Sequence, residues 1–301
     1  MMYEWEKCPF SGAVDPAYLD RELSGEPQVD PDGSVLGFSF VSSWRERVWR
    51  LISDLVTPAV VEAVVEDPPE FLVSDDLSWL NDVVSVIEDA DVDMKEVLAD
   101  RLTREFAFIR AFHGTRTATL APFYERGLRI LRPEEIEDLA RNLFVDDGRQ
   151  ANRLAEAITD MDARSPSKGR AGALYFCAST DNLISRYGGA GHYLVHGSEY
   201  LYCLGIRTRT IADTQRILKS IGRPTLFCCD VPLRMLRPGA LGEFAGTMLE
   251  TLFTEVLEAR IIDELPEGTQ TGFSIRQDLP STSIVGHWHP KRVYDPHHNA
   301  L

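Results

Sequence analysis

The stretch Phe112–Leu128, FHGTRTATLAPFYERGL, decides how the rest of the chain is interpreted. The apolar run FAFIRAF, residues 106–112, comes directly before His113-Gly114-Thr115. Such a run is typical of a buried strand, so we expect a strand that ends at the polar triplet. A polar triplet at a strand end is either an ordinary exit into a loop or a contact with a ligand.

Length and composition describe a globular chain. It has 301 residues, 44% hydrophobic and 26% charged, enough for one large domain or two ordinary ones. The N-terminus has neither a basic nor an apolar region of the secretory type, and residues 55–69, the most apolar window, are too few to span a bilayer. Five cysteines form no CxxC pair. We therefore expect a cytoplasmic protein, or one delivered into a target cytoplasm, without a membrane partner.

The acidic character of the chain is confined to its first third. Net charge is −16, and residues 1–100 hold 23 acidic against 6 basic residues, whereas the rest holds 24 and 25. Two interpretations stay open. The excess forms a solvated surface, or it forms a module that repels nucleic acid or docks a basic partner or inhibitor.

Hydrophobic periodicity divides the chain near residue 105. Residues 1–35 are rich in Pro, Gly and Asp and predict loops, whereas three segments follow helical spacing: 42–56, 77–90 and 94–108. Residues 1–104 are therefore predicted to form an acidic, mostly helical module. A fragment that starts at residue 105 is expected to fold without it.

Beyond residue 105, short aromatic and β-branched runs predict strands. They are residues 106–112, 172–179, 199–207, 225–233 and 252–262, with helical patterns at 133–144 and 151–161. Strand and helix do not alternate strictly. The predicted fold class is therefore α+β with largely antiparallel pairing.

The last predicted strand, LFTEVLEARII, carries a carboxylate in an apolar row. In a strand, Glu255 would share its face with Phe253 and Leu257, whereas Glu258 would share its face with Arg260. A carboxylate among apolar neighbours costs free energy unless it is ion-paired or hydrogen-bonded, or has a role in binding or catalysis that requires it there. Glu255 is thus favoured as a functional residue, although the choice among Glu250, Glu255 and Glu258 stays open.

These elements together resemble a known family. His-Gly-Thr at a strand end, a later Gly-x-x-Tyr-Phe strand with a second tyrosine about a dozen residues on, and a late glutamate on a strand resemble the His-Tyr-Glu ADP-ribosyltransferases of the poly(ADP-ribose) polymerase and diphtheria-toxin type. The resemblance covers residues 105–265 and implies split antiparallel β-sheets with flanking helices. It implies a catalytic domain over residues 105–301.

The resemblance also implies NAD as a substrate and a role for each matching residue. Glu255, His113 and Tyr175 would be catalytic, with Glu255 stabilising the positive charge that develops on the ribose. Tyr175 and Tyr187 would enclose the nicotinamide ring. The residues implied to bind NAD are His113, Gly114, Thr115, Tyr175, Ser179 and Tyr187.

The function implied is transfer of ADP-ribose from NAD to a macromolecular acceptor, a protein or a nucleic acid, in a toxin, effector or defence setting. NAD hydrolysis is one alternative, and a non-catalytic module that binds ADP-ribose or a partner is another. Neither the acceptor nor the oligomeric state follows from the sequence. Tyr175 lies 62 positions after His113, and this connection, which holds two helical patterns, is longer than in compact members of the family.

Several of these residues have a purely structural alternative. His113 is also compatible with an ordinary strand-end histidine, and Tyr175 with a core aromatic. Five arginines near the triplet are suited either to contacts with phosphates of a dinucleotide or nucleic acid, or to a solvated face: Arg110, Arg116, Arg126, Arg129 and Arg132. His287 and His289 share a strand face near His297 and His298. Because no matching Cys, Asp or Glu spacing accompanies them, no metal site is predicted.

Overall fold

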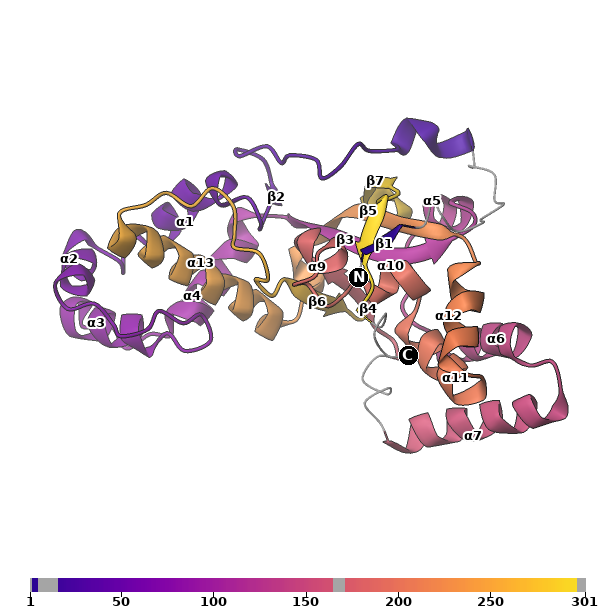
Figure 1. Cartoon of the computed structure of the whole chain (residues 1–301). Helices are drawn as coiled ribbons and strands as arrows, with labels where there is room; N and C mark the ends of the chain where they lie inside the picture. The colour runs from indigo at the N-terminus through magenta and orange to yellow at the C-terminus, as the bar shows by residue number, and fades with distance from the viewer. Residues whose placement is uncertain (1, 5–15, 165–170, 297–301) are drawn as a thin grey trace. The chain divides into compact units, whose positions relative to one another are not determined.

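The computed structural model describes residues 2–4, 16–164 and 171–296 (Figure 1). The chain forms two compact units. Unit 1 comprises residues 1–27, 111–230 and 267–301, and unit 2 comprises residues 28–110 and 231–266. This division differs from the predicted boundary at residue 105, because each unit combines segments that are distant in the sequence.

Unit 2 is mainly helical. Its elements are β2 (Val35–Leu36), η3 (Val41–Ser43), α1 (Arg45–Ile52), α2 (Pro58–Glu66), α3 (Ser78–Glu88), α4 (Met94–Glu105), η4 (Leu233–Met235) and α13 (Pro238–Glu258). The helices predicted over residues 42–56, 77–90 and 94–108 are confirmed as α1, α3 and α4. Asp93 begins α4, because its carboxylate accepts hydrogen bonds from the backbone N–H groups of Lys95 and Glu96.

Helix α13 replaces the strand predicted over residues 252–262, and that prediction is wrong. The helix begins with Pro238 in its first turn and runs for 21 residues. Its buried apolar side chains recur every three or four residues: Leu241, Phe244, Ala245, Met248, Leu249, Leu252 and Phe253. The eleven-residue window was too short to reveal this helical spacing.

The sheet of unit 1 is built around β3 (Phe108–Thr117), which begins in unit 2. The strand order is β6-β4-β3-β5-β7, with β2 pairing in parallel with the start of β3. The pairs β3–β4, β4–β6 and β5–β7 are antiparallel. The other strands are β4 (Leu174–Cys177), β5 (Arg223–Pro232), β6 (Gly272–Ile275) and β7 (Ile284–Trp288), and β1 (Met2–Glu4) pairs separately with β8 (Arg292–Tyr294). The α+β class and the strands predicted around residues 106–112, 172–179 and 225–233 are confirmed.

Helices surround this sheet. They are η2 (Pro16–Arg21), α5 (Ala121–Arg126), α6 (Pro133–Phe144), α7 (Gly148–Arg164), α9 (Asp181–Ile184), α10 (His192–His196), α11 (Glu199–Thr208), α12 (Ile211–Lys219) and η5 (Ser281–Ser283). Figure 1 shows α6, α7, α11 and α12 together beside the sheet. Phe144, Leu154 and Leu204 belong to their shared apolar core. The predicted helices 133–144 and 151–161 are thus confirmed.

Helix α11 occupies residues 199–207, where a strand was predicted, so that prediction is also wrong. The hydroxyl of Ser198 accepts a hydrogen bond from the Leu201 N–H and caps the helix. Gly205 lies so close to its neighbours that a Cβ there would be 2.4 Å from Thr214 and 2.8 Å from Phe144. A helix packed this closely is buried on several sides and loses the one-sided pattern that identifies amphipathic helices.

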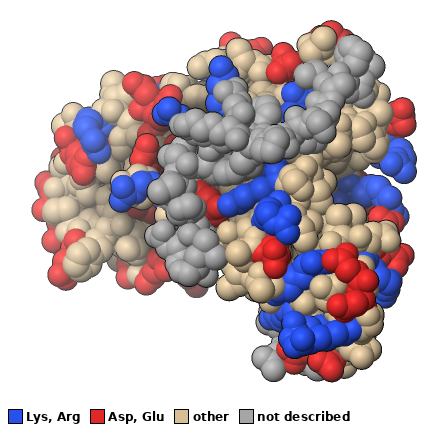
Figure 2. Space-filling model, turned by 45° about the vertical axis from the view of Figure 1, so that its right-hand side comes forward, with Lys and Arg blue, Asp and Glu red and all other residues tan. Residues whose placement is uncertain are grey.

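Charge is distributed rather than concentrated on the visible face. Figure 2 shows Asp and Glu side chains interspersed with Lys and Arg over the residues that it describes. Within unit 2, acidic residues enter ion pairs such as Arg47–Glu105 at 2.6 Å and Lys95–Glu243 at 3.1 Å. Partner docking on the acidic module therefore stays a prediction. Among the described residues, no helix is both long and apolar enough to cross a membrane.

Candidate functional site

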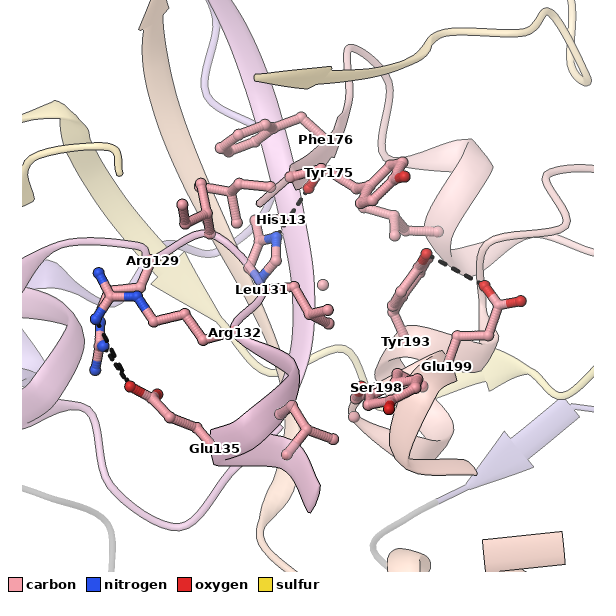
Figure 3. A pocket seen from close by; sticks show the side chains of 18 of the residues that line it. His113, Arg129, Leu131, Arg132, Glu135, Tyr175, Phe176, Tyr193, Ser198 and Glu199 are labelled. Atoms are coloured by element: carbon pink, nitrogen blue, oxygen red, sulfur yellow. Dashed lines mark hydrogen bonds and ion pairs between the residues drawn. The ribbon is translucent and has the colours of Figure 1, made fainter. Parts of the chain in front are cut away.

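A pocket of about 250 Å³ lies within unit 1. It is formed by β3, β4, the segment that leads into α6, and the region from α10 to the start of α11 (Figure 3). Its volume is close to the lower end of typical ligand pockets, about 300–1,000 Å³. The polar and aromatic residues that line it include His113, Arg129, Arg132, Glu135, Tyr175, Phe176, Tyr193, Ser198, Glu199 and Tyr200.

His113 is fixed in the pocket by the neighbouring strand. It lies within β3 rather than at the end of a strand, because β3 continues to Thr117. Its Nδ1 is 2.9 Å from the backbone oxygen of Tyr175 on β4 (Figure 3). Burial lowers the pKa of His113 below 6.5, so the ring is neutral at physiological pH. Since a carbonyl can only accept, Nδ1 carries the proton, and Nε2 is left with a lone pair that can accept a hydrogen bond.

Gly114 allows two helices to approach β3. A Cβ at this position would be 3.0 Å from Leu183 Cδ2 and 3.2 Å from Leu194 Cγ. Leu183 lies on α9 and Leu194 on α10, so a larger residue would press on the leucine side chains that these two helices pack against β3. Gly114 itself lines the pocket, and contact of its backbone with a ligand stays a prediction.

Tyr175 lies on β4 and lines the pocket next to His113. Its register partner on β6 is Ser274, and its side chain is only partly buried. A half-buried aromatic ring that lines a pocket is available for stacking on a flat ligand.

We expect Tyr175→Ala to weaken NAD binding by about 1–3 kcal/mol, since stacking on an aromatic ring contributes this much for a nucleobase. Tyr175→Phe should retain most of the affinity, because the ring face makes the contact. Isothermal titration of NAD into both variants measures the difference. A Phe variant as weak as the Ala variant would assign the contact to the hydroxyl group instead.

Three of the predicted NAD-binding residues lie outside this pocket. Thr115 follows Gly114 along β3, and the hydroxyl of Ser179 accepts a hydrogen bond from the Asp181 N–H at 3.2 Å. Tyr187 is 53% exposed, and the guanidinium of Arg186 lies 4.8 Å from the centre of its ring. The structure therefore does not bring Tyr187 together with Tyr175.

Glu255 lies on α13 in unit 2, whereas the pocket belongs to unit 1. Its carboxylate accepts hydrogen bonds from Arg45 Nη2 at 2.8 Å and Nε at 2.9 Å, and from the Ile262 N–H at 2.7 Å. The hydrogen bond with Glu255 raises the pKa of Arg45. The side chain of Glu255 is only 11% exposed. These contacts explain the buried carboxylate as a structural ion pair, and the strand-face argument for catalysis no longer applies.

Two pocket residues, Tyr193 and Glu199, were not among the predicted site residues. The Tyr193 hydroxyl is 3.5 Å from Glu199 Oε2, and His192 Nε2 is 3.4 Å from the same oxygen. Glu199 occupies the first turn of α11, where the helix dipole stabilises a negative charge. The signal in the sequence was Ser198 followed by Glu199, a helix start, but the aromatic residues after it led to the strand prediction.

Arg129, Arg132 and Glu135 form a charged group on the other side of His113. In Figure 3 they lie to the left of His113, and Tyr193, Ser198 and Glu199 lie to its right. Arg129 Nη2 donates to Glu135 Oε1 at 2.6 Å. One pocket thus combines a neutral histidine, aromatic rings, a carboxylate near tyrosine and two arginines.

His287 and His289 take part in a different cluster. The Tyr124 hydroxyl is 2.7 Å from His287 Nδ1, and His289 Nδ1 is 3.0 Å from the Pro224 oxygen. Burial lowers the pKa of both histidines to about 4. Among residues 2–4, 16–164 and 171–296, no three His, Cys, Asp or Glu side chains come together as a potential metal site. His297 and His298 lie outside the described residues.

Comparison with known proteins adds no relative. No family model, no curated protein and no solved structure matches this chain.

Proposed function

We propose that this chain cleaves the bond between nicotinamide and ribose in NAD and transfers ADP-ribose to a macromolecular acceptor. The observation that carries the proposal is the pairing of His113 with Tyr175 at one pocket: adjacent strands present a neutral imidazole and an aromatic ring to the same space. The resemblance of the sequence to the His-Tyr-Glu ADP-ribosyltransferases supplies the identity of the substrate.

The residues of the pocket suit this substrate. The lone pair on His113 Nε2 is an acceptor for a ribose hydroxyl, and the ring of Tyr175 offers a face to nicotinamide. When the glycosidic bond breaks, nicotinamide leaves with the bonding electron pair and positive charge develops on the ribose. A nucleophilic group of the acceptor then bonds to the anomeric carbon and loses a proton.

We assign the stabilising carboxylate to Glu199. Among the described residues that line the pocket, the carboxylates are Glu135 and Glu199. Glu135 is 53% exposed and paired with arginine, whereas Glu199 is 28% exposed and lies beside the Tyr193 hydroxyl. Glu199 is the less hydrated of the two carboxylates, and a less hydrated carboxylate interacts more strongly with a developing cation.

His113→Ala should lower NAD cleavage about tenfold, because one hydrogen bond to the ribose is lost. Incubation of NAD with the purified full-length chain, followed by mass spectrometry, measures free nicotinamide, free ADP-ribose and labelled acceptor. Labelled acceptor supports transfer, and free ADP-ribose alone supports hydrolysis. Complete absence of nicotinamide release by the folded wild-type chain, with candidate acceptors present, would refute the proposal.

A melting curve of His113→Ala serves as the control. If the variant melts early but keeps its activity per folded molecule, His113 has only a structural role in β3.

A further inference from the structure

Two guanidinium groups converge on one carboxylate oxygen where the pocket meets the start of α6. Arg129 Nη2 lies 2.6 Å from Glu135 Oε1, and Arg132 Nη1 lies 3.6 Å from the same oxygen. Arginine pairs of this kind are a common environment for phosphate oxygens, because guanidinium groups match their charge and geometry. The Glu135 oxygen thus occupies a position that suits an oxygen of a bound phosphate.

The guanidinium of Arg132 and the backbone beside Arg129 are held in place independently of Glu135. Asp278 Oδ1 accepts a hydrogen bond from the Ile130 N–H at 2.8 Å, and Asp278 Oδ2 accepts one from Arg132 Nη2 at 3.1 Å. Residues 129–132 are therefore anchored to the segment that carries Asp278. Removal of the Glu135 charge would leave this anchor intact.

Glu135 is easily displaced from this position. Its side chain is 53% exposed, and those of Arg129 and Arg132 are 32% and 38% exposed. Ion pairs at such exposure contribute little to stability, because water and salt compete with them. An anion with more charge than a carboxylate can take its place.

We propose that Arg129 and Arg132 form a pyrophosphate-binding subsite and that Glu135 occupies it as a competing anion within the chain. The nature of the natural ligand, the pyrophosphate of a dinucleotide, rests on the proposed function. A cavity of about 250 Å³ is small for a whole dinucleotide, so part of such a ligand extends beyond it. Glu135 then lowers the affinity of the two arginines for pyrophosphate, and its carboxylate must move away when the ligand binds.

The test measures binding of inorganic pyrophosphate to the full-length chain by isothermal titration. Glu135→Gln is compared with Glu134→Gln, which changes the net charge equally on the same helix but at a position outside the pocket. We expect Glu135→Gln to bind pyrophosphate about threefold more tightly than Glu134→Gln. Arg132→Gln should bind it at least about threefold more weakly than the wild type, and nicotinamide binding should be equal in all four proteins.

Equal pyrophosphate affinities for Glu135→Gln and Glu134→Gln would overturn the proposal, as would wild-type affinity in Arg132→Gln. This result is independent of NAD cleavage. Should the wild type bind pyrophosphate in the expected pattern but leave NAD intact, only the proposed function fails. Should it cleave NAD while the affinities do not follow the pattern, only the subsite fails.

Discussion

A fragment that begins at residue 105 should fail to fold, in contrast to the expectation from the sequence. The deletion removes α1 to α4 but keeps α13, which belongs to the same unit. Phe253 on α13 packs against Trp49 and Trp79, with ring centres 5.8 and 5.1 Å apart, and Phe244 packs against Phe38 at 4.5 Å. All three partners would be lost.

The free-energy cost of this loss is comparable with the stability of a whole domain. Full burial of a Leu, Met or Phe side chain contributes about 1.5–3 kcal/mol, and α13 buries six such residues together with Ala245. Exposure of most of this surface costs on the order of 10 kcal/mol, whereas the free energy of unfolding of a domain is about 5–15 kcal/mol. Half of this value already equals the free energy of unfolding of a domain at the lower end of that range, about 5 kcal/mol.

Circular dichroism and light scattering of the fragment 105–301 measure the outcome. We expect aggregation and no cooperative thermal transition. Co-expression of residues 1–104 as a separate chain is the control, because it restores the partners of α13 without restoring the peptide bond. A fragment that melts cooperatively and binds NAD alone would contradict the two units described above.

The sequence predicted the central strands well because their local patterns are unambiguous. β3, β4 and β5 each contain a short apolar run, and α6 shows apolar residues on one face only. The polar triplet after the run FAFIRAF directed attention to His113 and Gly114, and both line the pocket. No pattern in the sequence indicated that β3 continues through the triplet to Thr117.

The errors have a common physical origin in burial on several sides. Tyr200, Leu201, Tyr202 and Leu204 of α11 are all buried, so the segment lacks a polar face and its aromatic content suggested a strand. Sequence spacing alone does not distinguish a buried helix from a strand in so short a run. The error matters for the proposed function, because it concealed Glu199 at the first turn of α11.

For Glu255, the physical premise was sound, but the strand on which the choice of a catalytic role depended does not form. A carboxylate among apolar residues does need a partner, and Arg45 is that partner. The two residues are 210 positions apart, a pairing that a single sequence gives no means to find. In a helix, moreover, residues 253 and 255 point about 200° apart, so the row of apolar neighbours assumed for a strand does not exist.

Glu199→Gln should lower NAD cleavage about 100-fold or more, the largest effect that we expect of a single substitution on activity. The change keeps the size of the side chain and removes the negative charge that opposes the developing cation. Loss of one preorganised electrostatic group lowers the turnover rate about 10²- to 10³-fold. NAD affinity should change little, because the charge acts mainly on the transition state.

Glu255→Gln is the matched comparison, since it removes one carboxylate charge with the same change of side chain. Here we expect unchanged cleavage per folded molecule and a lower melting temperature, because a buried arginine loses its counterion. Breaking a buried ion pair on one side costs about 3–5 kcal/mol, and the 18% exposure of Arg45 reduces this toward the lower value. Single-turnover kinetics and thermal melting on both variants separate the two roles.

The opposite pattern would reverse the assignment. A Glu255→Gln protein that melts like the wild type but no longer cleaves NAD would show that α13 carries the catalytic carboxylate. An active Glu199→Gln protein would remove Glu199 from the mechanism. The expected pattern follows from where each carboxylate is held: Glu255 is neutralised by the arginine that stabilises unit 2, whereas Glu199 faces the same pocket as His113 and Tyr175.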